Sequence, residues 1–221
     1  MTGTIEQVAS STLAVVVPVK SFGEAKQRLD PHLERAQRAD LARYLADRVI
    51  GVILDGGATP WVACDDDEVE HWARAAGARI AWTPGLGLNG AIAAGVGTAI
   101  EAGSRHVIVS HADLARPKSL LSVASPATIT LVPDRHLDGT NVMAFPAGAV
   151  VEPSYGPQSF HRHLTSARST ADVAGHRVTV LRSSDLGLDV DTINDVRHPA
   201  IREDLPRWLR IHPDNRSTPT G

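Results

Sequence analysis

Two patterns of hydrophobic positions alternate along this chain. Short runs rich in apolar and β-branched residues predict strands, and the run at 13–19, which has no polar alternation, predicts a strand fully buried within a sheet. These runs cover residues 13–19, 60–65, 78–82, 106–110, 127–133, 141–146 and 176–182. Between them, apolar residues recur three and four positions apart, which predicts amphipathic helices. The predicted helices run from Asp30-Pro31 to Ile53 and over 67–77, 88–103 and 157–168, and Pro117 opens a short one.

This alternation of strands and helices predicts an α/β fold, with a mostly parallel sheet and helices on both faces. A chain of 221 residues suits one domain. We expect that domain over residues 13–205, between a disordered lead at 1–12 and a tail at 206–221. In such sheets, ligands bind beyond the carboxyl ends of the strands, where the strand order reverses. The residues that follow each strand are therefore the first candidates for a site.

The composition excludes several classes of protein. Hydrophobic residues make up 43% of the chain and charged residues 21%, which is typical of soluble globular proteins. A net charge of -3 gives no basic surface for nucleic acid. The single cysteine, Cys64, excludes a disulfide framework and a zinc site built on several cysteines. Without a long apolar run or a signal-like start, the sequence predicts a cytoplasmic protein with no membrane partner.

Three cationic residues follow the first predicted strand. Lys20, Lys26 and Arg28 lie close together, and Gly23 permits a tight turn between them. Such a loop could hold the phosphates of a nucleotide, or it could be an ordinary solvated basic loop. The motifs GxxxxGK[ST] and GxGxxG are both absent, which argues against an ordinary kinase and a dinucleotide-dependent reductase.

A glycine-rich turn precedes the helix predicted over 88–103. It places Asn89 and Gly90 at the helix start, where backbone amides could approach a base or ribose. The alternative is a loop that tolerates glycine because helix and sheet pack closely there.

Polar and small residues also surround the strand at 141–146 and the start of the helix at 157–168. They are Thr140, Asn141, Gly156 and Ser159. Ser159 and the neighbouring amides could bind an acidic group at the helix N-terminus, or Ser159 could simply cap the helix. His161 and His163 lie two positions apart on this helix, so they face different directions and suit packing or surface roles better than a shared metal.

Three carboxylates are candidate ligands for a divalent cation. Asp113 follows the predicted strand at 106–110, and Asp189 and Asp191 flank one valine in an extended segment. Alternate residues of an extended chain point the same way, so both could face one ion. Each also has a structural alternative, as a turn former or a helix cap.

Five segments together resemble one known family. "VVVPVKSFGEAKQRL", "GLNGAIAAG", "PDRHLDGTN", "YGPQSFHRHLTSA" and "LGLDVDTINDV" stand in the order seen in the 2-phospho-L-lactate and phosphoenolpyruvate guanylyltransferases of coenzyme F-420 biosynthesis. The resemblance covers roughly residues 13–197. It implies a nucleotidyltransferase fold similar to GT-A glycosyltransferases, which is a three-layer α/β/α sandwich with a mostly parallel mixed sheet.

The resemblance also implies a reaction. GMP passes from GTP to a small phosphorylated carboxylic acid (phosphoenolpyruvate, 2-phospho-L-lactate or 3-phosphoglycerate), and pyrophosphate is released. The implied cofactor is Mg²⁺, with Mn²⁺ as an alternative, and a homodimer is one of the oligomeric states left open. The implied catalytic residues are Lys20, Lys26 and Arg28, which would bind the triphosphate and stabilise the leaving pyrophosphate. The nucleotide would be bound by Lys20, Asn89 and Gly90, with Asn89 and Gly90 near the guanosine. The acid is assigned to Thr140, Asn141, Gly156 and Ser159, and the metal to Asp113, Asp189 and Asp191.

Residue 111 departs from the family pattern. The family usually has Asp-x-Asp here, and this chain has His111-Ala112-Asp113. Imidazole is a poorer ligand for magnesium than carboxylate, because magnesium prefers hard oxygen donors. Two alternatives therefore stay open beside the guanylyltransferase: a divergent paralogue that binds GTP without efficient turnover, and a nucleotidyltransferase for another acceptor. Against the second, the first loop lacks the "LAGG"-type sequence of such relatives.

Overall fold

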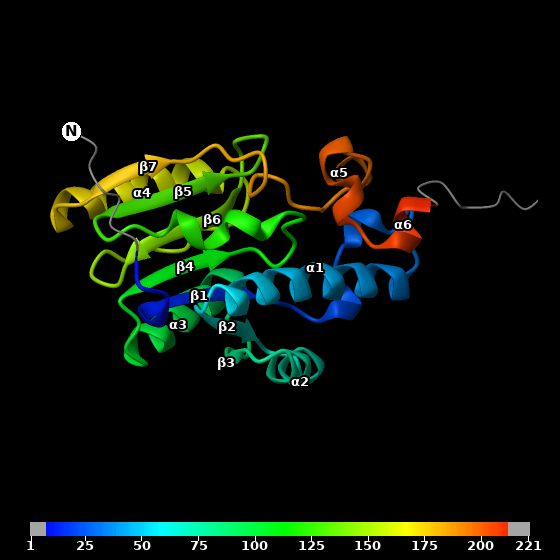
Figure 1. Ribbon diagram of the computed structural model, residues 1–221, viewed down its shortest axis with the longest axis horizontal. Coiled ribbons are helices and arrows are strands. Elements are labelled where there is room, and N and C mark those ends of the chain that lie inside the picture. Colours follow the sequence, from blue (N-terminus) through cyan, green and yellow to red (C-terminus); the bar gives the residue numbers. More distant parts are fainter. Residues whose placement is uncertain (1–7, 212–221) are drawn as a thin grey trace, which may run out of the picture.

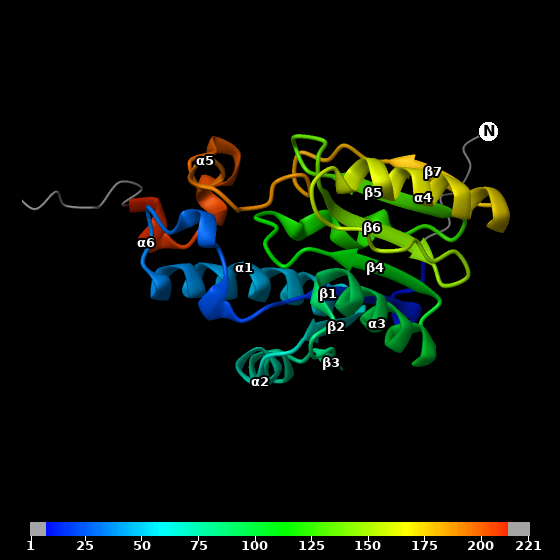
Figure 2. The same ribbon diagram turned by 180° about the vertical axis from the view of Figure 1, so that it is seen from behind.

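The computed structural model describes residues 8–211 and shows a sheet covered by helices on both faces (Figures 1 and 2). Within this range, seven strands form one sheet in the order β3-β2-β1-β4-β6-β5-β7. The strands are β1 (Leu13–Pro18), β2 (Thr59–Cys64), β3 (Arg79–Trp82), β4 (His106–Ser110), β5 (Thr128–Pro133), β6 (Thr140–Pro146) and β7 (Arg177–Val180). Both pairs that involve β6 are antiparallel and the other four are parallel. The mostly parallel mixed sheet is confirmed.

The antiparallel direction of β6 follows from a short connection. Only residues 134–139 separate it from β5, which is enough for a hairpin and too short for a crossover. Asp134 organises this loop, because its carboxylate accepts hydrogen bonds from the amides of His136, Asp138 and Gly139.

The described helices are α1 (Arg35–Asp55), α2 (Asp67–Ala75), α3 (Gly87–Glu101), α4 (Ser159–Ala174), α5 (Ile193–Val196) and α6 (Arg207–Ile211). Short 3-10 helices cover η1 (Ser10–Thr12), η2 (Phe22–Glu24), η3 (Gln27–Leu29), η4 (Pro117–Val123) and η5 (Pro199–Asp204). Within residues 8–211, no helix combines the length and the hydropathy that crossing a bilayer requires.

The central strands of the sheet are buried on both faces, as the apolar run at 13–19 predicts, whereas the edge strands β3 and β7 are largely exposed. In β1, Val15 and Val17 pack with α1, α2 and η4, while Ala14 and Val16 pack with α3 and α4. The sandwich therefore has three layers. A further apolar cluster joins the first half of α1 to the C-terminal segment, through Leu41, Leu45, Leu188, Val190, Val196, Ile201, Leu205 and Leu209.

The predicted start of the first long helix was wrong. The first long helix begins at Arg35 rather than at Asp30-Pro31, because Glu34 and Gln37 form a capping box there. The Asp30 carboxylate instead accepts a hydrogen bond from Arg38 at 2.5 Å.

Helix α6 lies within the range predicted as a tail. Its Leu209 is only 2% exposed. At the other end, η1 falls within the predicted lead. The rest of both predicted termini, residues 1–7 and 212–221, lies outside the described residues.

Candidate active site

A pocket of about 400 Å³ opens at the carboxyl ends of β1 and β4. The chain runs from β1 outward to β2 and β3 and returns to β4 on the other side of β1, so the strand order reverses here. Ligands bind at this position in open α/β sheets. The pocket walls include Lys20 and Lys26 from the loop after β1, His111 and Asp113 after β4, and Asp191.

Lys26 and Asp113 form an ion pair at the base of this pocket. Nζ of Lys26 lies 2.5 Å from Oδ2 of Asp113, and the Lys26 side chain is only 7% exposed. Lys26 adopts a left-handed backbone conformation (φ 56°), which is unfavourable for a residue other than glycine. Burial raises the pKa of Asp113, but the adjacent Lys26 ammonium outweighs it and holds that pKa below its usual range. Asp113 is therefore ionised at neutral pH.

Asp189 lies beside Asp113 because two distant segments pair as a short ladder. Leu114 forms an antiparallel bridge with Asp189, and the Val190 amide donates to the Asp113 carbonyl at 3.1 Å. Nδ2 of Asn141 donates to Oδ1 of Asp189 at 3.2 Å. Burial, and then the negative charge of Asp113, raise the pKa of Asp189. Two mutually repelling carboxylates thus lie next to each other, and Asp113 is the one that lines the pocket.

One carboxylate oxygen of this pair has no hydrogen-bond donor among the described residues. Oδ1 of Asp113 is buried, yet it accepts no hydrogen bond from residues 8–211. A buried carboxylate oxygen without a donor is costly and suits a cation. Mg²⁺ is commonly bound by one or two carboxylates together with water and substrate phosphates. The Asp113 and Asp189 pair fits such an ion.

Asp191 does not join that pair in this structure. Its Oδ2 lies 2.7 Å from Nη1 of Arg28, whose side chain is 73% exposed. Among residues 8–211, no three His, Cys, Asp or Glu side chains converge as metal ligands would. Of the three predicted ligands, Asp113 and Asp191 line the pocket and Asp189 lies beside Asp113, but the three do not form a single preformed cluster.

His111 forms part of the pocket wall next to Asp113. Its Nδ1 lies 3.8 Å from Oδ1 of Asp113, and its amide donates to the Asn141 carbonyl. Nε2 of His111 is buried and has no hydrogen bond within residues 8–211. On the other side, the ring lies 5.2 Å from the ring of Tyr155, centroid to centroid. The Tyr155 ring in turn lies 4.6 Å from the ring of His163, centroid to centroid.

His163 holds the segments predicted to bind the acid. The Ser154 amide donates to Nε2 of His163 at 2.8 Å, and Nδ1 of His163 lies 3.0 Å from Oγ1 of Thr140. The sequence prediction of a packing role for His163 is confirmed. The sequence did not predict that His163 hydrogen-bonds these two segments. A signal was available, because His163 has helical spacing from Phe160 and Ala167, and all three are buried on the inward face of α4.

The other predicted acid-binding groups lie beyond His111 and do not line the 400 Å³ pocket. Asn141 donates to Asp189 and to the Leu186 carbonyl, and Ser159 is buried. Gly156 has φ 129°, a conformation that favours glycine. The amides of Ser159 and Phe160 already donate to the carbonyls of Gly156 and Asp138. The start of α4 therefore offers fewer free donors than the sequence suggests.

Asn89 has a structural role in this conformation. Its Oδ1 accepts from the Tyr155 amide at 2.6 Å, and its Nδ2 donates to the Tyr155 carbonyl at 3.3 Å. Gly90 packs on Leu86, where an added Cβ would lie 2.9 Å from the Leu86 Cβ. Neither residue lines the 400 Å³ pocket or the cavity described next, whereas their neighbours Gly87, Leu88 and Ala91 line that cavity.

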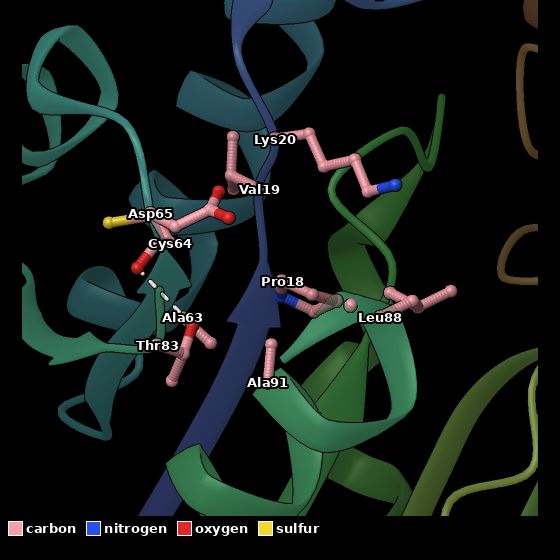
Figure 3. A pocket seen from close by; sticks show the side chains of 10 residues that line it. Pro18, Val19, Lys20, Ala63, Cys64, Asp65, Thr83, Leu88 and Ala91 are labelled. Atoms are coloured by element: carbon pink, nitrogen blue, oxygen red, sulfur yellow. Dashed lines mark hydrogen bonds between the residues drawn. The ribbon is translucent and has the colours of Figure 1, made fainter. Parts of the chain in front are cut away.

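A second, narrower cavity adjoins the pocket on the β2 side. It lies between the ends of β1 and β2 and the start of α3 (Figure 3). Its lining is Pro18, Val19, Lys20, Ala63, Cys64, Asp65, Thr83, Gly87, Leu88 and Ala91. Because Pro18, Val19, Lys20 and Leu88 line both cavities, the two are adjacent. We call this narrower cavity the side slot.

Comparison with known proteins agrees with this architecture. Over 197 residues the chain is 33% identical to a phosphoenolpyruvate guanylyltransferase of Sphaerobacter thermophilus, covering 86% of this chain and 93% of that protein. It is 29% identical over 187 residues to a 2-phospho-L-lactate guanylyltransferase of Methanothermobacter thermautotrophicus, covering 82% and 81%. A Desulfovibrio desulfuricans structure described as a nucleotide-diphospho-sugar transferase shares the fold, with a TM-score of 0.68, 18% identity and coverage of 84% and 85%.

The family match extends over nearly the whole folded region. Residues 13–202 match the family described as "Guanylyl transferase CofC like". The matched range contains every strand of the sheet and both carboxylates of the Asp113 and Asp189 pair. The chain therefore belongs to the CofC-like guanylyl transferase family.

Proposed function

We propose that this protein transfers GMP from GTP to phosphoenolpyruvate or 2-phospho-L-lactate in coenzyme F-420 biosynthesis. One observation carries the proposal: Asp113, which has a buried oxygen lacking a donor within residues 8–211, lines a pocket together with Lys20 and Lys26, and Asp189 lies beside it. Both curated relatives described above are guanylyltransferases for these acids, which supports the choice of substrates. 3-Phosphoglycerate is a third candidate of the same chemical class.

The reaction joins two anions, so the protein must align them and neutralise charge. An oxygen of the acceptor phosphate bonds to the α-phosphorus of GTP. The bond from that phosphorus to the bridging oxygen breaks, and pyrophosphate leaves with the electron pair. The attacking oxygen is already ionised, so the step needs no general base.

The chain's own cations have distinct parts in this step. Lys26 is fixed by Asp113, so its charge is held in place before substrate arrives. Lys20 and Arg28 lie nearer to solvent, where they suit the departing pyrophosphate. A divalent ion held by Asp113 and Asp189 would supply further charge neutralisation on the phosphates. Metal dependence is part of this proposal.

The acid is assigned to Thr140, Asn141, Gly156 and Ser159 by the resemblance alone. The structure supports a connection between these residues and the pocket. The Asn141 carbonyl accepts from the His111 amide, and Thr140 is joined through His163 to the Tyr155 loop. A rearrangement of these acid-binding segments would therefore shift the residues of the pocket wall around His111.

A second candidate, GTP binding without turnover, is favoured by His111. This imidazole stands where the family usually offers a carboxylate, and it lies 3.8 Å from Oδ1 of Asp113. Fewer hard oxygen ligands would weaken magnesium binding and slow the transfer.

One assay separates the two candidates. The protein is incubated with GTP, either Mg²⁺ or Mn²⁺, and each of the three acids in turn. Pyrophosphate release and the mass of the guanosine product are then measured. We expect release with at least one acid and none after chelation of the metal. Calorimetric GTP binding without any release would favour the second candidate.

Substitution of Lys26 tests the site itself. Lys26→Met removes a fixed cation and leaves Asp113 unpaired, so we expect kcat to fall by about 100-fold or more. Lys118→Met is the matched control, because Lys118 is exposed on η4 and lines neither cavity. Equal rates for the two variants would contradict the role given to Lys26.

A further inference from the structure

The two ends of the side slot carry side chains of opposite charge. In Figure 3 the Asp65 carboxylate points from the end of β2 toward Val19, whereas the Lys20 side chain extends to the opposite side of β1. Lys20 also lines the larger pocket, which holds the Lys26 and Asp113 ion pair. The end of the slot at Asp65 is thus anionic, and the end beside the pocket is cationic. A ligand with hydrogen-bond donors at one end and phosphates at the other matches this arrangement.

At its end of the slot, Asp65 is the side chain whose hydrogen-bonding atoms are available to a ligand. Within residues 8–211 its carboxylate makes no hydrogen bond or ion pair. Thr83 is engaged, because its hydroxyl donates to the Cys64 carbonyl at 3.2 Å. Cys64 is buried, and burial raises the pKa of its thiol to about 11, so it stays neutral. Apart from Lys20 at the opposite end, the remaining lining of the slot consists of apolar side chains and the backbone around Gly87.

The residues that the sequence offered for the nucleoside are otherwise occupied. Both polar atoms of the Asn89 side chain bond to the Tyr155 backbone, and Gly90 packs on Leu86. The recognition of a base must therefore come from another side chain.

We propose that Asp65 is the specificity-determining residue of this enzyme, which reads the Watson–Crick edge of guanine. An ionised carboxylate only accepts hydrogen bonds, and it has two oxygens to accept them. Guanine presents two adjacent donors on that edge, N1–H and the N2 amino group. Adenine and cytosine each present a ring acceptor next to an amino group, and uracil presents one donor between two carbonyls. Only guanine therefore satisfies both oxygens at once.

The dimensions of the slot agree with an edgewise fit. The slot volume is about 30 Å³, so it admits the edge of a planar ring while the sugar stays outside. With the base edge at Asp65, the ribose lies over Leu88, which lines both cavities. The phosphates then reach the larger pocket at Lys20 and Lys26.

This inference rests on the proposed function in taking GTP as the nucleotide, and its test uses three purine nucleotides. ITP lacks the N2 amino group, and XTP has a carbonyl in its place. We expect wild type to prefer GTP over ITP and XTP by roughly 10- to 100-fold in kcat/KM, the amount expected of a good bidentate contact. Asp65→Asn exchanges one acceptor for a donor, so it loses most of its GTP activity and comes to prefer XTP.

Asp67→Asn is the matched control. It removes the same charge two residues later, from an exposed side chain at the start of α2 that does not line the slot. It should keep the nucleotide preference of wild type. If Asp65→Asn also keeps that preference, the assignment of Asp65 is wrong while the guanylyltransferase function stands.

Binding by calorimetry, without any acid, covers the case of no turnover. Selective GTP binding that Asp65→Asn shifts toward XTP would support the inference even if the proposed transfer failed. Equal binding of GTP, ITP and XTP to wild type, or no binding of any of them, would overturn it.

Discussion

His163 should make the folded protein sensitive to acid, and one substitution should remove that sensitivity. The side chain is fully buried on α4. Because Nε2 accepts a hydrogen bond from the Ser154 amide, the ring is neutral and Nδ1–H donates to Thr140. Burial, with smaller contributions from Arg162 and His111, lowers the pKa of His163 from 6.5 to about 4.

The direction and size of the effect follow from linkage. The unfolded chain binds this proton at a higher pH than the folded protein does, so acid favours unfolding. The contribution of a neutral His163 is fully present above pH 6.5 and is lost progressively as the pH falls toward 4. With about 1.4 kcal/mol for each pH unit between the two values, the free energy of unfolding should fall by about 2 to 3 kcal/mol between pH 7.5 and 4.5.

His163→Gln provides the comparison. Its amide oxygen can accept from Ser154 and its amide nitrogen can donate to Thr140, but it does not titrate. The free energy of unfolding is measured by urea denaturation at pH 7.5 and 4.5. We expect wild type to lose about 2 to 3 kcal/mol more than His163→Gln over this range. His161→Gln, an exposed position on the same helix, should behave like wild type. The same acid loss in wild type and His163→Gln would refute the reasoning.

Three further predictions concern packing and the metal. Gly95→Ala should destabilise the protein by about 1 to 3 kcal/mol in thermal unfolding, because the new Cβ would lie 2.9 Å from a valine methyl of β1. Gly97→Ala, with open space around it, should instead stabilise α3 by up to about 1 kcal/mol, and the same sign for both would contradict this. Asp189→Ala should lower kcat by about 100-fold or more. Asp191→Ala should lower it by less, since the partner of Asp191 is an exposed arginine, and both variants should keep the circular dichroism of wild type. Similar losses of kcat in the two variants would count against the central role of Asp189. His111→Asp should increase the magnesium-dependent rate, and an unchanged rate across a magnesium titration would exclude a ligand position there.

The arrangement of the sheet could be predicted because its signals are local. Val15 and Val17 belong to an apolar run without alternation, and such a run is buried on both faces whatever packs against it. The start of α1 was misplaced because Asp30-Pro31 has the composition of a helix cap. The N-cap actually used is Glu34, a less common residue at this position, and Gln37 completes the capping box at N3.

The site was only partly predictable because its contacts are not local. The carboxylates and lysines could be named from their places after strands, but the pairing of Lys26 with Asp113 joins residues 87 positions apart. Likewise, Asn89 at the start of a helix after a glycine-rich turn predicts a nucleoside-binding residue. Only the fold shows that both polar atoms of its side chain hydrogen-bond to the Tyr155 backbone. Asp65 drew no attention in the sequence, since an acidic residue before a helix usually serves as a cap.

The ladder between residues 113–115 and 188–190 has a consequence for biosynthesis of the protein. Strands β1 to β4 can pair as they leave the ribosome, since each neighbours a strand already made. Asp189 and the apolar residues that cover the first half of α1 emerge much later. The nascent chain should therefore pass through a stage with an ordered sheet and an unfinished catalytic centre. Competence for chemistry would arrive in one late step, when the C-terminal segment docks on α1.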